Sequence, residues 1–419
     1  MKFFEESTYR KIHVLLLGLI AFTLPFPIIL NSVLIILCVT LLILQGSFIK
    51  AVQNASKNLY VILLWLLFLL YITSAFFSKN QHEGFAIIER KASFIILPLL
   101  IFGFPISISE IKKICELFVL GVILAFIICI GHAFYQVVFN SRELELFFYQ
   151  KLTAVLNMNA VYMASYSIIA LHIALYFSKE YHKVLVATVS ILLIIFCVLL
   201  NSKMMLVCLC IGLMIFAFKK LSRLQALLAS SIILVSMFFV GVGVPRVKER
   251  ITLEVNSNMS VVKQGTFRYD TPFTGTSLRL VFWRFSNEII NENNGWVMGV
   301  HTGDFQDLLN EKYKRTGIYT GNPELKDTGY LGYGPHNQYI EVLLSLGFIG
   351  LTLFLILLIL YVKKAWLTSN YLGLQCICLF LFFFITESVL SVNKGIVVFV
   401  FFTLLFYNLN VQSKHSEDK

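Results

Sequence analysis

The stretch from residue 245 to residue 335 contains no cysteine, although the whole chain of 419 residues contains eight. All eight lie within or at the edge of apolar runs. A disulfide framework and a cysteine-based zinc site are therefore not supported. The pairs Cys208-x-Cys210 and Cys376-x-Cys378 are better explained as small apolar residues inside helices than as metal ligands.

The chain also lacks the alternation of polar and apolar residues that is typical of membrane β-barrel strands. Its hydrophobic content is 58% and its mean hydropathy is +0.81. Many apolar runs are roughly 15 to 25 residues long, which suits helices that cross a bilayer and is more than a soluble core can absorb. The sequence therefore predicts an all-α polytopic integral membrane protein, with residues 1–419 forming a single membrane domain.

Hydropathy predicts about 12 transmembrane helices, with one long loop between the ninth and the tenth. The expected spans are residues 13–28, 30–46, 59–77, 93–108, 117–138, 157–177, 183–200, 204–218, 224–244, 338–362, 368–388 and 391–409.

Lysine and arginine in the short connections predict the orientation. With the amino terminus inside, sixteen of them fall on inner segments and seven on short outer segments. Cytoplasmic loops carry the excess of cations, so both termini are expected in the cytoplasm and residues 245–335 in the periplasm. The net charge of +11 is then mostly a topology signal, and a nucleic-acid partner is not expected.

The long loop is the part of the chain that resembles an active-site segment. Residues 277–291 and 304–314 have helical periodicity and are expected to form amphipathic helices. Between them, residues 291–303 are rich in asparagine and glycine, which favours a turn that brings the backbone close to another segment. The loop is also dense in aromatic residues, which suit anchoring at lipid headgroups and stacking on sugar rings equally well.

Three titratable side chains stand out on the expected outer face. Lys203 lies in a tight turn between two spans, where a cation needs a partner or water, or else reaches the surface. Arg279 lies on the first loop helix, one turn before Trp283, and alone is compatible with a solvated surface charge. His336 opens the tenth span, where an imidazole can take a proton from a substrate whose other half lies in lipid, although a capping role is the simpler explanation of such a histidine taken alone.

The string from Pro335 to Leu351, PHNQYIEVLLSLGFIGL, resembles the O-antigen ligase and polymerase superfamily, and most closely O-antigen ligase. In that superfamily a His-Asn-x-Tyr opening is followed by Gly-x-x-Gly on the same helix, here Gly347 and Gly350. The glycine pair alone would equally indicate close helix packing. The turn at Ser202-Lys203 and the Arg-x-x-x-Trp of Arg279 and Trp283 agree with the resemblance, which covers residues 200–351.

The resemblance implies a glycosyltransferase of the inner membrane, acting in lipopolysaccharide biosynthesis. It would move a glycan from undecaprenyl pyrophosphate to lipid A-core, or to another glycan acceptor, on the periplasmic face. His336 would be the base or the acceptor-orienting group, and Arg279 and Lys203 would stabilise the leaving pyrophosphate without a metal or a cofactor. The substrate-binding residues expected beside them are Trp283, Asn337, Tyr339, Arg246 and Arg250.

One position departs from the family pattern. Lysine stands at position 203, where the family usually has arginine, and lysine lacks the fork that binds a phosphate through two hydrogen bonds. Arg246 or Arg250 is therefore a candidate to share that role.

Other classes of protein are also compatible with the sequence. An O-antigen or exopolysaccharide polymerase and a protein O-oligosaccharyltransferase share the chemistry and differ in acceptor. Twelve spans also fit a secondary transporter, but the two halves of the chain show no repeat of the kind common in transporters. A structural membrane scaffold would not require the combination of Arg279, Trp283 and His336.

Overall fold

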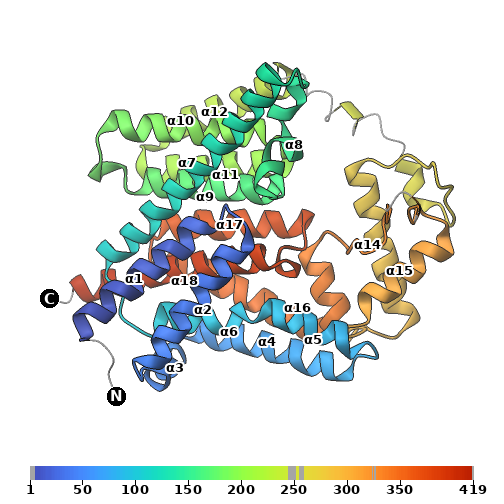
Figure 1. Ribbon diagram of the computed structural model, residues 1–419, viewed down its shortest axis with the longest axis horizontal. Coiled ribbons are helices and arrows are strands. Elements are labelled where there is room, and N and C mark those ends of the chain that lie inside the picture. Colours follow the sequence, from blue (N-terminus) through green and yellow to red (C-terminus); the bar gives the residue numbers. More distant parts are fainter. Residues whose placement is uncertain (1–4, 244–251, 254–258, 323, 325–326, 418–419) are drawn as a thin grey trace.

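The computed structural model describes residues 5–243, 252–253, 259–322, 324 and 327–417 (Figure 1). Within these ranges the regular structure is helical, and the only strand-like pairing is an isolated bridge between Asn322 and Asp327. The all-helical class predicted from the sequence is therefore confirmed for the described part of the chain.

The described α-helices are bounded as follows: α1 Glu6–Thr23, α2 Ile28–Leu44, α3 Phe48–Ala55, α4 Leu59–Phe77, α5 Gln81–Lys91, α6 Ser93–Phe102, α7 Ile108–Phe139, α8 Tyr149–Thr153, α9 Ala160–Tyr176, α10 Lys183–Leu199, α11 Lys203–Lys220, α12 Arg223–Gly243, α14 Gly275–Glu292, α15 Phe305–Thr316, α16 Gln338–Leu367, α17 Tyr371–Thr386 and α18 Asn393–Glu417.

A helix overlaps each of the expected spans, but the count of twelve membrane crossings is not confirmed. Among the described residues, three helices are long and apolar enough to cross a membrane, namely α4, α7 and α16, and the number rises to five if two bent helix pairs each count as one span. The shortfall has a physical reason, because several of the other apolar helices are short. For example, α6 has only 10 residues and contains Pro98. The long apolar helices identify a membrane protein, and its orientation stays a prediction.

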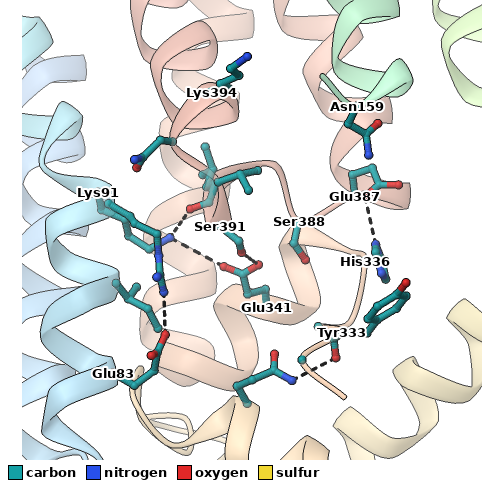
Figure 2. Close-up of a pocket in the computed structure, with 18 of the residues that line it drawn as sticks. Glu83, Lys91, Asn159, Tyr333, His336, Glu341, Glu387, Ser388, Ser391 and Lys394 are labelled. Carbon is teal, nitrogen blue, oxygen red and sulfur yellow. Dashed lines mark hydrogen bonds and ion pairs between the residues drawn. The ribbon is translucent and has the colours of Figure 1, made fainter. Parts of the chain in front are cut away.

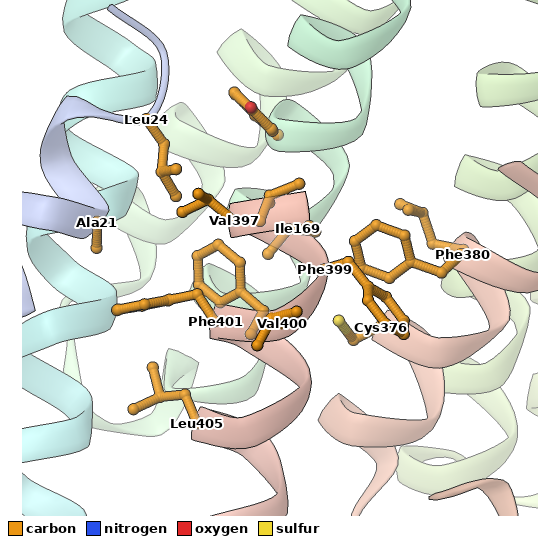
Figure 3. Packing of buried hydrophobic residues seen from close by; sticks show 14 of the residues in the cluster. Ala21, Leu24, Ile169, Cys376, Phe380, Val397, Phe399, Val400, Phe401 and Leu405 are labelled. Atoms are coloured by element: carbon orange, nitrogen blue, oxygen red, sulfur yellow. The ribbon is translucent and has the colours of Figure 1, made fainter. Parts of the chain in front are cut away.

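The centre of the helix bundle is α18. Every side chain from Ile396 to Phe406 is buried, so this part of the helix is packed on all sides. Figure 3 shows its Phe399 and Phe401 among side chains of α1, α9 and α17. Lipid is as apolar as these partners, so close packing is what holds α18 in place.

The two helices predicted in the long loop are present as α14 and α15, and they pack together beside the bundle (Figure 1). Thr274 caps α14 by accepting a hydrogen bond from the backbone N–H of Ser277. Phe282 and Phe285 of α14 are fully buried, and both rings contact Tyr313 of α15. The loop therefore has a small apolar core of its own.

Helix α16 is broken at Gly347, whose backbone has φ 63° and ψ −162°. The predicted glycine-rich turn fills the break. The N–H of Phe348 donates to the carbonyl of Trp296 at 2.8 Å, and the N–H of Val300 donates to the carbonyl of Leu344 at 2.7 Å. Backbone groups freed inside a membrane helix need such partners, so the long loop and α16 fold as one unit.

Helix α4 holds the same junction from the other side. The hydroxyl of Ser74 donates to the carbonyl of Ser345 at 3.0 Å and accepts from the N–H of Thr302 at 2.9 Å. The first turns of α16, with the residues just before them, are therefore fixed relative to α4 and α5.

Candidate active site

A cavity of about 990 Å³ lies where α5, α15, α16 and the connection between α17 and α18 meet (Figure 2). Its walls include α5, the start of α15, residues 332–336, the first turns of α16 and several residues between Glu387 and Lys394. A cavity of this size accommodates a substrate rather than a few water molecules. His336 is the only one of the predicted site residues within the described ranges that lines it.

His336 stands at the mouth of α16, as predicted. Its backbone lies in the left-handed region with φ 47°, and the next residue, Asn337, caps α16 by accepting a hydrogen bond from the N–H of Ile340 at 3.0 Å. The imidazole stacks on Phe282 with the ring centroids 6.3 Å apart. Its Nδ1 is 3.0 Å from Oε2 of Glu387. A carboxylate that accepts from Nδ1–H fixes the tautomer and leaves the lone pair on Nε2.

Arg279 has partners other than the expected pyrophosphate. Its Nη2 contacts Oε1 of Glu387 at 3.0 Å, its Nε donates to the carbonyl of Thr386 at 3.0 Å, and its Nη1 donates to the carbonyl of Gly275 at 3.0 Å. The guanidinium therefore holds the end of α17 and the Glu387 carboxylate. It is joined to His336 through that carboxylate, because each carboxylate oxygen contacts one of the two side chains.

Three of the residues predicted to bind substrate make contacts within the protein. Trp283 donates from its indole to the carbonyl of Pro335 at 2.9 Å, which places the residue before His336. Asn337 donates to the carbonyl of Ile385 at 3.1 Å, and Tyr339 donates to the carbonyl of Leu381 at 3.0 Å. None of the three lines the cavity. The structure therefore favours a positioning role for them over direct substrate contact.

Lys203 begins α11 after the predicted tight turn, in which Asn201 is left-handed with φ 44°. The side chain of Lys203 is half-buried and does not line the cavity, so its predicted contact with pyrophosphate is not supported by its position. Arg246 and Arg250 lie outside the described residues, and their predicted role stays a prediction.

The cations that do line the cavity are Arg90, Lys91 and Lys394. Lys91, at the end of α5 and outside the apolar spans, is almost completely buried. Its Nζ lies 3.8 Å from Oε1 of Glu341 and donates to the carbonyl of Leu390 at 2.5 Å. Burial lowers the pKa of Lys91 to about 8, against the opposing effect of Glu341.

Sequence reasoning missed these cavity residues as functional ones. Arg90, Lys91 and Lys394 are among the seven cations that the orientation argument places on short outer segments, and the sequence suggested no further role for them. It suggested no role for Glu387. A usable signal was present at Glu387, which stands alone between two long apolar runs, because an isolated acid in that setting needs a partner.

Among the described residues, no three His, Cys, Asp or Glu side chains are grouped so that they could hold a metal ion. The expectation of transfer without a metal stays a prediction.

The fold and the site together define a helical membrane protein with a histidine and a carboxylate at a substrate-sized cavity. The family model described as O-antigen ligase matches residues 188–355, a range that includes Lys203, Arg279, His336 and the break at Gly347. Residues 188–355 are thus similar to the O-antigen ligase family, and the resemblance predicted from the sequence is confirmed for this region. No curated protein matches the chain. Members of this family are glycosyltransferase-like enzymes.

Proposed function

We propose that this protein is an O-antigen ligase-type glycosyltransferase. It moves a glycan from undecaprenyl pyrophosphate to lipid A-core on the periplasmic face of the inner membrane. The observation that carries the proposal is the contact between Nδ1 of His336 and Glu387, on the wall of a cavity of about 990 Å³.

The arrangement of His336 suits a general base. With Nδ1–H directed to Glu387, Nε2 accepts the proton of an acceptor hydroxyl. The hydroxyl oxygen then forms a bond to the anomeric carbon of the donor sugar. The bond from that carbon to the pyrophosphate oxygen breaks, and the leaving pyrophosphate keeps the electron pair. Arg279 acts here through Glu387, as a positioning residue.

The leaving pyrophosphate is stabilised by cations on the cavity wall. A second cavity of about 430 Å³ shares Arg90 and Lys394 with the first and continues along apolar residues of α2 that include Ile35 and Ile36. A lipid-linked donor fits this pair of cavities, with its pyrophosphate at Arg90 and Lys394 and its lipid chain beside α2. Arg90 is already within 2.8 Å of Glu83, and Lys394 stands in the first turn of α18.

Arg279→Lys should lower transfer strongly, because one ammonium cannot hold Glu387, Thr386 and Gly275 together as the planar guanidinium does. Initial rates with the lipid-linked glycan measure this. The matched control is Arg284→Lys on the same helix, since Arg284 contacts Val262 and Glu288 instead.

The double variant Arg279→Lys with Glu387→Gln separates the two roles considered for Arg279. A positioning role predicts that the double variant is little worse than Glu387→Gln alone, whereas independent contact with pyrophosphate predicts that the two losses add. For Lys203, loss of transfer in Lys203→Ala together with retention in Lys203→Arg would restore the predicted pyrophosphate contact.

The orientation is tested by labelling. In a cysteine-free background, a cysteine at exposed position Lys263 should react with an impermeant thiol reagent added outside, and one at exposed position Lys220 should not. The expectation follows from the excess of cations on the inner segments. The reverse pattern would place the cavity on the cytoplasmic side and contradict the use of an externally presented donor.

The acceptor is tested with a deletion strain and with purified protein. Loss of all capped lipid A-core on deletion, together with transfer to lipid A-core in vitro, is the expected result. A strain that still attaches a single repeat unit to lipid A-core would instead identify a polymerase.

A further inference from the structure

The cavity has an inner end that the proposed chemistry at His336 does not use. Glu341 and Ser345 follow the capping residue Asn337 by one and two turns of α16, so they lie deeper along the same helix face. Both line the cavity, and both are almost fully buried. Glu341 accepts a hydrogen bond from the hydroxyl of Ser391, and it forms an ion pair with Lys91 (Figure 2).

Three hydroxyl groups at this inner end have no hydrogen-bond partner among the described residues. They belong to Tyr71, Ser345 and Ser388, and all three residues line the cavity. Tyr71 and Ser345 are each 1% exposed. A buried hydroxyl without a partner costs free energy, and such groups are uncommon in native proteins. Other unpartnered buried side chains, such as Tyr361, do not line the cavity, whereas these three residues do and are therefore placed to meet a bound molecule.

The chemistry of this inner pocket suits a neutral molecule with many hydroxyl groups. The Lys91 ammonium lies 4.3 Å above the Tyr71 ring and its charge is balanced by Glu341, so the pocket offers little net charge to hold an anion. Hydroxyls donate and accept, and a carboxylate accepts from the hydroxyls of a sugar. The inner pocket therefore fits a saccharide better than a phosphate.

We infer that the inner pocket formed by Tyr71, Lys91, Glu341, Ser345 and Ser388 binds the donor sugar that is linked to the pyrophosphate. The assignment to the donor rests on the proposed function. Arg90, where we place the pyrophosphate, is the neighbour of Lys91 in the chain. Because Arg90 and Lys91 line the same cavity, the sugar joined to the pyrophosphate is the part of the donor nearest to this pocket.

The test removes the unpartnered hydroxyls one at a time. Tyr71→Phe and Ser345→Ala should leave the melting temperature unchanged or raise it, because neither hydroxyl has a partner among the described residues. Each should weaken the binding of lipid-linked glycan isolated from the source cells by about tenfold, the effect of one lost hydrogen bond of about 1.4 kcal/mol. Binding of bare undecaprenyl pyrophosphate should stay at the parent value. The matched control is Tyr361→Phe, which removes a buried hydroxyl that has no partner in the described part of the chain. Tyr361 does not line the cavity.

Equal binding of the lipid-linked glycan by the parent, Tyr71→Phe and Ser345→Ala would overturn the inference. Weaker binding of the bare carrier as well would also overturn it, because the hydroxyls would then contact the pyrophosphate or the lipid. Failure of the proposed function gives a different result, in which the parent protein itself binds neither molecule and transfers no glycan. In that case the assignment of this pocket to the donor sugar would also be wrong, because it rests on the proposed function.

Discussion

His336→Ala should lower glycan transfer by roughly 10²- to 10⁴-fold, the range that a positioned general base contributes. Donor binding should stay close to the parent value, because donor affinity is expected from the lipid chain and from the cavity cations Arg90 and Lys394. The measurement is transfer in vitro from purified undecaprenyl pyrophosphate glycan to lipid A-core. His336→Gln then separates the two possible roles, since glutamine can orient an acceptor by hydrogen bonding but cannot take its proton at neutral pH.

Glu387→Gln should cause a loss of similar size. A glutamine amide can donate to Nδ1 of His336, which would move the imidazole proton to Nε2 and remove the lone pair that accepts the acceptor proton. The control is His301→Ala. The backbone of His301, in the long loop, is also in the left-handed region, with φ 70°, but His301 does not line the cavity. If His336→Ala transferred glycan at the parent rate, His336 would be a structural residue at the start of α16, and the proposed catalytic role would be wrong.

Gly347→Ala should strongly lower both the amount of folded protein and its melting temperature. The backbone of Gly347 has φ 63° and ψ −162°, a region that is essentially restricted to glycine, and strain of this kind costs about 1–3 kcal/mol. A Cβ there would also lie 2.2 Å from the carbonyl oxygen of Val297, which is a backbone atom and cannot rotate away. Transfer should fall further than stability alone explains, because the same break holds the helix that positions His336.

The control is Gly131→Ala in α7. A Cβ at Gly131 meets no atom within 4 Å, so this change should be neutral or slightly stabilising. Melting curves of detergent-purified protein measure both variants. A parent-like melting temperature for Gly347→Ala would mean that α16 is continuous and that residues 296–300 of the long loop do not enter it.

Most helices were predictable from the sequence because apolar runs and capping residues are local features. The loop helices α14 and α15 follow from helical periodicity, and His336 at the start of α16 follows from the change from a polar to an apolar run. The role of Gly347 was not predictable, since a glycine that allows close helix packing and one that allows a break look alike in a sequence.

The partners of the site residues were less predictable, because they depend on contacts between distant segments. Glu387 is 51 residues from His336 and 108 residues from Arg279. The family resemblance implied pyrophosphate as the partner of Arg279. Only the placement of α14 against the end of α17 shows the carboxylate that Arg279 contacts. The role of Lys91 was unpredictable for the same reason, because its contacts are with Glu341 of α16 and Leu390 in the connection before α18.

The position of Glu387 also bears on the order in which the enzyme becomes competent during synthesis. Arg279 and His336 leave the ribosome well before Glu387, which lies between the last two helices. Until α17 and α18 are inserted, the imidazole has no carboxylate to set its tautomer, and Lys394 is absent from the cavity wall. Under the proposed mechanism, a chain that ends before α17 would therefore transfer no glycan, although it already contains Arg279 and His336. Under the proposed mechanism, glycan transfer then requires α17 and α18 to be in place, so its onset would report that the last two helices have been added.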